Sequence, residues 1–166
     1  MGSEISTTLK AKWLLFTQCL PLLKKSEHGS VVNISSIAGI AGRSGPAALV
    51  FNDGYSAANR AISSFTETWA REAAPTIRVN ELILGLIRNR HGEETRGWTA
   101  LSEEERNMLY QHTLLGRTGT PAEVAEAVFF LASQATYMTG SVVRMDGGYL
   151  LGGDRTSPLP HGILTP

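Results

Sequence analysis

The sequence contains little cysteine, no net charge and no long apolar run. Its single cysteine, Cys19, has no intrachain disulfide partner and lies in an apolar stretch, where we expect a small buried side chain. Fifteen basic and fifteen acidic residues cancel, which excludes a broad attraction to nucleic acid or to an anionic membrane. No segment approaches the roughly 18 apolar residues that span a bilayer, and the N-terminus has no apolar signal core. We therefore expect a cytoplasmic protein with no membrane partner.

The first third of the chain predicts a helix, a strand and a loop. Between residues 8 and 25, apolar side chains recur at every third or fourth position, the spacing of an amphipathic helix that Pro21 should kink or shorten. The β-branched run VVNIS, residues 31–35, suits a strand buried on both faces. Residues 39–54 are rich in glycine and include a proline, which indicates a loop.

The middle of the chain predicts a second helix and a second strand. The helix should run from Tyr55 to Ala74, because apolar residues lie along one face of it: Ala58, Ile62, Phe65, Trp69 and Ala73. The segment 77–84, IRVNELIL, has strand composition. Strands that alternate with helices of this length predict a parallel sheet flanked by helices, and the length of 166 residues fits one domain.

The last part of the chain carries two helix-start signals and a final strand. Ser102 precedes three glutamates, and Thr120 is followed by a proline and by the glutamate of a capping box. Residues 140–148 predict a strand and a tight turn. The stretch 153–166 is rich in Gly and Pro and is expected to be an extended or disordered arm.

Five segments, in this order, resemble the C-terminal half of the short-chain dehydrogenase/reductase family: VNISS (32–36), YSAAN (55–59), RVNELILG (78–85), GRTGTPAEVAEAVFFLAS (116–133) and TGSVVRMDGGY (139–149). The resemblance covers about residues 8 to 152. It implies a Rossmann-like three-layer α/β fold over residues 1–152 that lacks the N-terminal βα units. It also implies a homo-oligomer that uses NAD or NADP to interconvert a small-molecule alcohol and carbonyl.

The resemblance places the catalytic hydroxyls of the family at Ser36 and Tyr55. A carbonyl that accepts a hydride becomes an alkoxide, which needs a proton donor and a second hydrogen-bond donor. Tyr55 would be the acid and Ser36 would orient the oxygen, with Ser35 as the alternative serine. Four residues after Tyr55, where the family has lysine, this chain has Asn59, which can hydrogen-bond a ribose but carries no charge.

The implied cofactor contacts are Tyr55, Asn59, Gly85, Ile87 and Asn89. Thr8 stands where the family has an asparagine, and no glycine-rich loop for a pyrophosphate follows a strand. These departures leave three hypotheses open: an active oxidoreductase, a truncated non-catalytic relative that acts through oligomerisation, and the second half of a split enzyme. No metal site is expected, because His91 in its polar, glutamate-rich segment is more typical of solvated surface.

Overall fold

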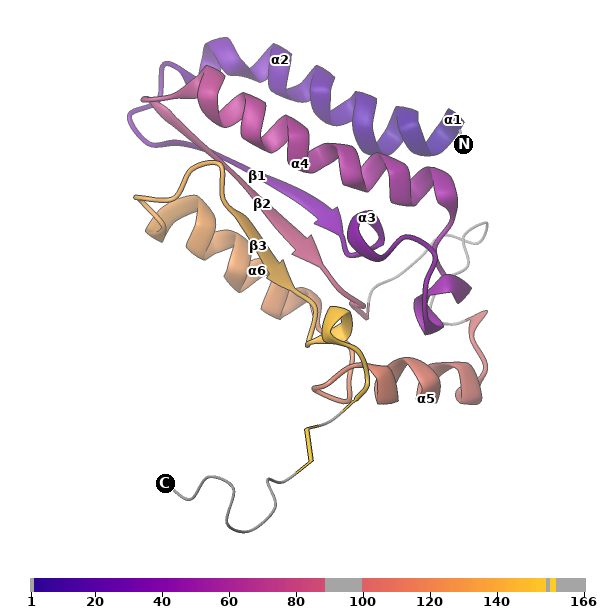
Figure 1. Cartoon of the computed structure of the whole chain (residues 1–166). Coiled ribbons are helices and arrows are strands. Elements are labelled where there is room, and N and C mark those ends of the chain that lie inside the picture. Colours follow the sequence, from indigo (N-terminus) through magenta and orange to yellow (C-terminus); the bar gives the residue numbers. More distant parts are fainter. Residues whose placement is uncertain (1, 89–99, 155, 158–166) are drawn as a thin grey trace, which may run out of the picture.

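The computed structural model describes residues 2–88, 100–154, 156 and 157. Its centre is a parallel sheet in the order β1 (Gly29–Ser36), β2 (Ile77–Leu84), β3 (Val142–Met145). Every residue of β1 pairs with one of β2, while β3 pairs with the second half of β2. The parallel register brings the carboxyl ends of all three strands to one edge (Figure 1). This confirms the predicted α/β class.

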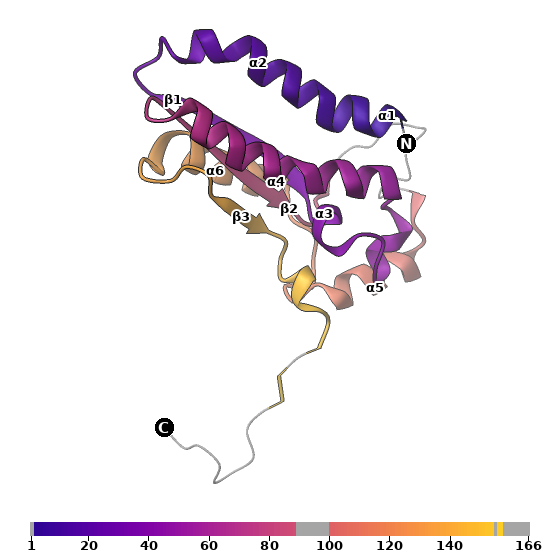
Figure 2. The same ribbon diagram turned by 45° about the horizontal axis from the view of Figure 1, so that its top comes forward.

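One face of the sheet is covered by α4 (Asp53–Ala73) and by a continuous N-terminal helix. That helix consists of α1 (Gly2–Glu4), the π-helical η1 (Ile5–Lys10) and α2 (Ala11–Leu23), and it lies beside α4 in two views (Figures 1 and 2). The Phe16 ring of α2 stacks on Trp69 of α4 with centroids 4.3 Å apart. Both rings join a buried cluster with residues at the start of β2: Ile77 and Val79.

Two expectations about α2 concern Pro21 and Cys19. Pro21 lies inside the helix, which continues past it to Leu23, so the proline does not cut the helix short. Cys19, however, is exposed, so the expectation of a buried cysteine is wrong. The inward stripe of α2 is formed by Phe16, Leu20 and Leu23, and Cys19 lies about 100° around the helix from Leu20.

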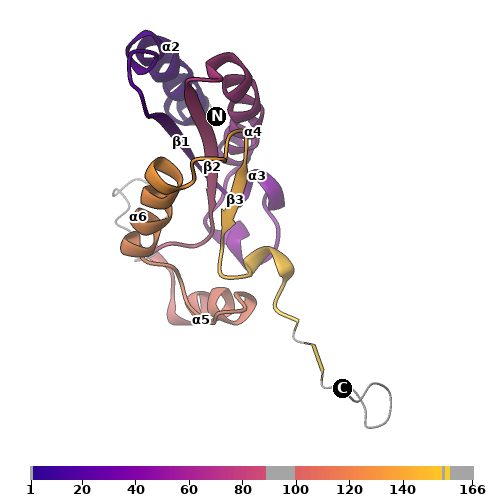
Figure 3. The ribbon, with the colours of Figure 1, turned by 90° about the vertical axis from the view of Figure 1, so that its left-hand side faces the viewer.

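The opposite face is covered by α6 (Pro121–Phe129) and its π-helical continuation η4 (Phe130–Gln134), as Figure 3 shows. The Thr120 capping box forms as predicted. At the far end of η4, the Arg78 guanidinium of β2 donates to three carbonyl oxygens at 2.8–2.9 Å, those of Leu131, Ala132 and Ala135. These bonds satisfy carbonyls that a helix end leaves free and fasten this layer to the sheet.

The segment 39–54 is only in part the predicted loop. It contains α3 (Ala38–Ala41) and the 3-10 helix η2 (Pro46–Leu49), separated by glycines at 42 and 45 with φ near +60°. η2 packs against α5 (Glu103–His112) and lies close to the turn η5 (Tyr149–Leu151). α5 starts at the predicted Ser102 cap, where Glu105 completes a capping box. Within the described ranges, no helix combines the length and apolar character needed to cross a bilayer.

Candidate active site

Three elements that carry residues singled out from the sequence, β1, β2 and α4, pack together, and two of them end at the carboxyl edge of the sheet. Ser36 ends β1 and pairs in register with Leu84, and Gly85 follows directly. Tyr55 lies in the first turn of α4, which packs against α3 just beyond Ser36. At Gly39, an added Cβ would lie 2.7 Å from a backbone nitrogen of α4, so a larger residue would push α3 away from this helix.

Ser36 is buried, and its hydroxyl is only partly used. The oxygen accepts a hydrogen bond from the backbone N–H of Ala38 at 3.1 Å. The hydroxyl proton has no recorded acceptor within the described ranges, so it can be donated to a ligand. Ser35 is different, because its hydroxyl donates to the buried carboxylate of Glu81 on β2. Neighbouring residues of a strand point to opposite faces, so Ser35 faces away from Ser36.

The backbone of Tyr55 is held firmly and its phenol is uncommitted. Its N–H donates to Oδ1 of the N-cap residue Asn52 at 2.8 Å, and Nδ2 of Asn52 donates to the Glu4 carboxylate at 2.9 Å. Its ring lies 6.1 Å from that of Phe51, centroid to centroid. The structure records no hydrogen bond of the Tyr55 hydroxyl among the residues it describes. Sequence reasoning missed Asn52, although an asparagine at a helix start is a usual cap signal.

Asn59 lies one turn further along α4 and is 3% exposed. Its Nδ2 donates to the backbone carbonyl of Tyr55 at 2.9 Å, which ties this side chain to the backbone of the tyrosine. Arg60 follows it but is exposed. The side chain at the family's lysine position therefore uses one donor within its own helix and brings no charge to the phenol.

The other predicted cofactor contacts have structural surroundings of their own. At Gly85, an added Cβ would lie 2.5 Å from Cα of Asp146, so close packing of β2 against the end of β3 requires glycine there. Ile87 forms an isolated parallel bridge with Gly119. Asn89 and His91 lie outside the described residues. Elsewhere, no group of three or more potential metal ligands occurs in the ranges 2–88, 100–154 and 156–157.

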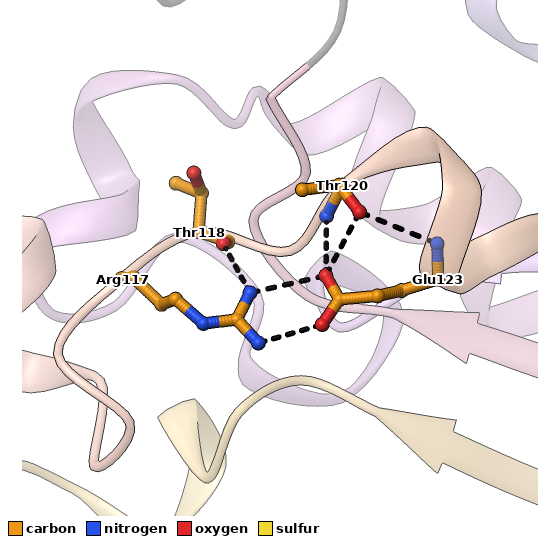
Figure 4. Close-up of polar contacts among 4 residues, drawn as sticks. All are labelled: Arg117, Thr118, Thr120 and Glu123. Atoms are coloured by element: carbon orange, nitrogen blue, oxygen red, sulfur yellow. Dashed lines mark hydrogen bonds and ion pairs between the residues drawn. The ribbon is translucent and has the colours of Figure 1, made fainter.

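A cavity of about 70 Å³ lies beside these residues, at the ends of β2 and β3. Its lining includes Ile87, Leu115 and Met145 but not Ser36, Tyr55 or Asn59. At its rim Arg117 forms two hydrogen bonds with Glu123, at 2.6 and 3.0 Å (Figure 4). The hydrogen bond from Arg117, and to a smaller extent those from Thr120, lower the pKa of Glu123 to about 2. This cavity is a neighbour of the candidate site, separate from its two hydroxyls.

Comparisons with known proteins agree with the fold. A family model described as enoyl-(acyl carrier protein) reductase matches residues 3–150. A 3-oxoacyl-[acyl-carrier-protein] reductase of Thermotoga maritima is 36% identical over 149 residues, which are 89% of this chain and 56% of that protein. Its counterpart in Aquifex aeolicus is 34% identical over 146 residues, with 87% and 54% covered. The chain thus spans about half the length of these relatives.

Solved structures give the same result. A short-chain dehydrogenase/reductase from Brucella melitensis, named as a glucose/ribitol dehydrogenase, has a TM-score of 0.72 and 30% identity over 87% of this chain and 54% of its own. A 3-oxoacyl-[acyl-carrier protein] reductase from the same organism has a TM-score of 0.71 and 27% identity, with 87% and 51% covered. The range matched by the family model, residues 3–150, contains all three strands of the sheet.

Proposed function

Because the chain belongs to the short-chain dehydrogenase/reductase family, we propose that it provides the reaction centre of an oxidoreductase that interconverts alcohols and carbonyls with NAD or NADP. One observation carries the proposal. Two hydroxyls, of Ser36 and Tyr55, lie on elements that meet at the carboxyl edge of a parallel sheet, and each keeps a proton to donate. This edge is where open α/β sheets bind their ligands.

The residues present fit one end of a nicotinamide cofactor. The phenol of Tyr55 is uncommitted, and Asn59 keeps an amide oxygen that can accept from a ribose hydroxyl. Outside the undescribed segments, no glycine-rich turn joins a strand to a helix in the way that binds a pyrophosphate. The cofactor, when bound, supplies or accepts the hydride.

The chain's own residues would manage the oxygen of the substrate. During reduction, Tyr55 donates its phenolic proton to the oxygen as the carbonyl carbon gains a hydride, and water then reprotonates the phenolate. Ser36 donates a hydrogen bond to the same oxygen and stabilises its developing charge. Asn59 and Asn52 act through Tyr55 by holding the first turn of α4 in place.

Cofactor binding and turnover test this proposal. We expect saturable binding of NADH or NADPH by calorimetry and reduction of acetoacetyl-coenzyme A. Tyr55→Phe should lower kcat by about 10²-fold or more, while Tyr137→Phe, which changes a fully exposed tyrosine, should have no effect. Absence of binding up to millimolar cofactor would contradict the proposal.

We propose a second role in homo-oligomerisation, carried by α2. Leu15 and Leu22 on this helix are 65% and 67% exposed, and Trp13 and Leu14 are exposed as well. Large exposed apolar side chains gathered on one helix are typical of a surface that contacts another protein. Light scattering should show an oligomer that the pair Leu15→Lys and Leu22→Lys converts to a monomer. A wild-type monomer at high concentration would contradict this role.

A further inference from the structure

We infer that Glu81 is a positioning residue for Ser36 and that it acts through the hydroxyl of Ser35. The inference rests on the proposed function, because it concerns the serine that would hold the substrate oxygen. It starts from an acidic side chain in β2, the middle strand of the described sheet, which is 1% exposed. A strand buried on both faces normally carries apolar side chains. Glu81 therefore needs an explanation.

The carboxyl group of Glu81 has fewer partners than its burial demands. Its Oε1 accepts a hydrogen bond from the hydroxyl of Ser35, and its Oε2 has no hydrogen-bond partner within the described ranges. None of the ion pairs recorded in those ranges includes this residue. A buried polar atom without a partner lowers stability, and such exceptions in a core are typical of functional sites.

The Ser35–Glu81 hydrogen bond lies on the face of the sheet that α4 covers. On β1, Nδ2 of Asn33 donates to Oγ1 of Thr66 in α4 at 2.9 Å, so this side chain faces the helix. Residues two apart in a strand share a face, which places Ser35 on the same side. The bond to Glu81 thus ties the end of β1 to β2 underneath the helix that carries Tyr55.

The end of β1 has few other restraints. β1 is an outer strand of the described sheet, so β2 holds it along one side only. Past Ser36, the N–H of Ile37 donates to the carbonyl of Leu84 at 2.9 Å, and the N–H of Ala38 donates to Oγ of Ser36 at 3.1 Å. Ends of elements open more easily than their centres. A side-chain tie at the residue before Ser36 restricts the backbone rotation that sets the direction of its hydroxyl.

The double variant Ser35→Ala with Glu81→Leu removes both partners of the hydrogen bond. Replacement of a buried polar pair by apolar side chains is close to neutral or favourable, so the melting temperature should be unchanged or higher. The amide of Ala38, which reports on Oγ of Ser36, should nevertheless exchange its hydrogen on the order of tenfold faster relative to the amide of Leu82 in β2. The kcat for acetoacetyl-coenzyme A should fall by on the order of tenfold with little change in KM.

Two controls separate positioning from a general effect on the sheet. Glu81→Gln keeps an oxygen that can accept from Ser35, so exchange at Ala38 and kcat should stay within about twofold of the wild type. Asn33→Leu with Thr66→Val removes another buried polar pair on the same face, three residues before Ser36. This second control should leave the relative exchange rate of Ala38 unchanged.

Wild-type exchange at Ala38 in the Ser35–Glu81 double variant would overturn the inference. Equally fast exchange in either control, or an unchanged kcat of the double variant in an active chain, would also overturn it. If the double variant does not fold, Ser35→Ala alone gives the test through the same ratio of exchange rates.

Hydrogen exchange requires neither cofactor nor substrate, so it is independent of the proposed function. Faster exchange at Ala38 in a chain that binds neither NADH nor NADPH refutes only the oxidoreductase assignment. Unchanged exchange in a chain that turns over substrate refutes only the positioning role of Glu81.

Discussion

The hydrogen bond from Ala47 to Tyr149 joins the loop before Tyr55 to the C-terminal turn, and Tyr149→Phe should show what it contributes. The substitution removes one oxygen and keeps the ring. The N–H of Ala47, a residue with 0% exposure, would then be buried without an acceptor. Such a group costs roughly 1–3 kcal/mol. The free energy of unfolding from urea titration should fall by that amount, a large part of the 5–15 kcal/mol typical of a domain.

Hydrogen exchange and pH give two further readouts of the same variant. Amides of residues 45–51 should exchange faster in Tyr149→Phe, while those of β1 and β2 keep their protection. Burial, opposed by the Ala47 N–H, raises the pKa of Tyr149 above the ordinary value of 10.0. Above about pH 10 the Tyr149 phenol is protonated in the folded protein and ionised in the unfolded one, so unfolding releases a proton and the stability of the wild type falls. The variant has no phenol at this position and should lack this part of the decline. Tyr137→Phe, at an exposed tyrosine, is the control. If the two variants differ by less than about 0.5 kcal/mol in their loss of unfolding free energy, the reasoning is refuted.

Three further predictions concern the sheet edge and the helices. Gly85→Ala should lower the free energy of unfolding, measured by urea titration, by roughly 1–3 kcal/mol, because the new Cβ would lie 2.5 Å from Cα of Asp146. Gly2→Ala is the control and should change it little, because no atom lies within 4 Å of the new Cβ. Thr120→Ala removes the N-cap of α6 and should lower the free energy of unfolding by about 1 kcal/mol. The pKa of Glu123 is lowered to about 2, so the stability of the wild type should decline as the pH falls from 4.5 toward 2. If Glu123→Gln shows the same decline in acid as the wild type, this prediction is contradicted. Burial lowers the pKa of Lys12, so Lys12→Met should raise thermal stability at pH 7, by an amount that shrinks toward pH 10.5; a destabilised variant would contradict it.

The order of elements could be predicted from sequence because it depends on local patterns. The strand predicted at 77–84 is β2 to the residue, and the helix predicted from Tyr55 starts only two residues earlier, after the Asn52 cap. The errors concern tertiary surroundings. The exposure of Cys19 depends on which stripe of α2 meets α4, and η2 is held by Tyr149, about a hundred positions away. Hydrophobic periodicity carries neither piece of information.

Sequence also predicts one part of the candidate site and misses another. The positions of Ser36 and Tyr55 follow from a strand end and a helix start, which a short window of sequence can predict. Short-range bonds to Asn52, Asn59 and Ala38 hold these two residues, but the segments around them are joined by contacts across 46 to 102 positions: Ser35 with Glu81, Glu4 with Asn52, and Ala47 with Tyr149. None of these pairs leaves a local signal.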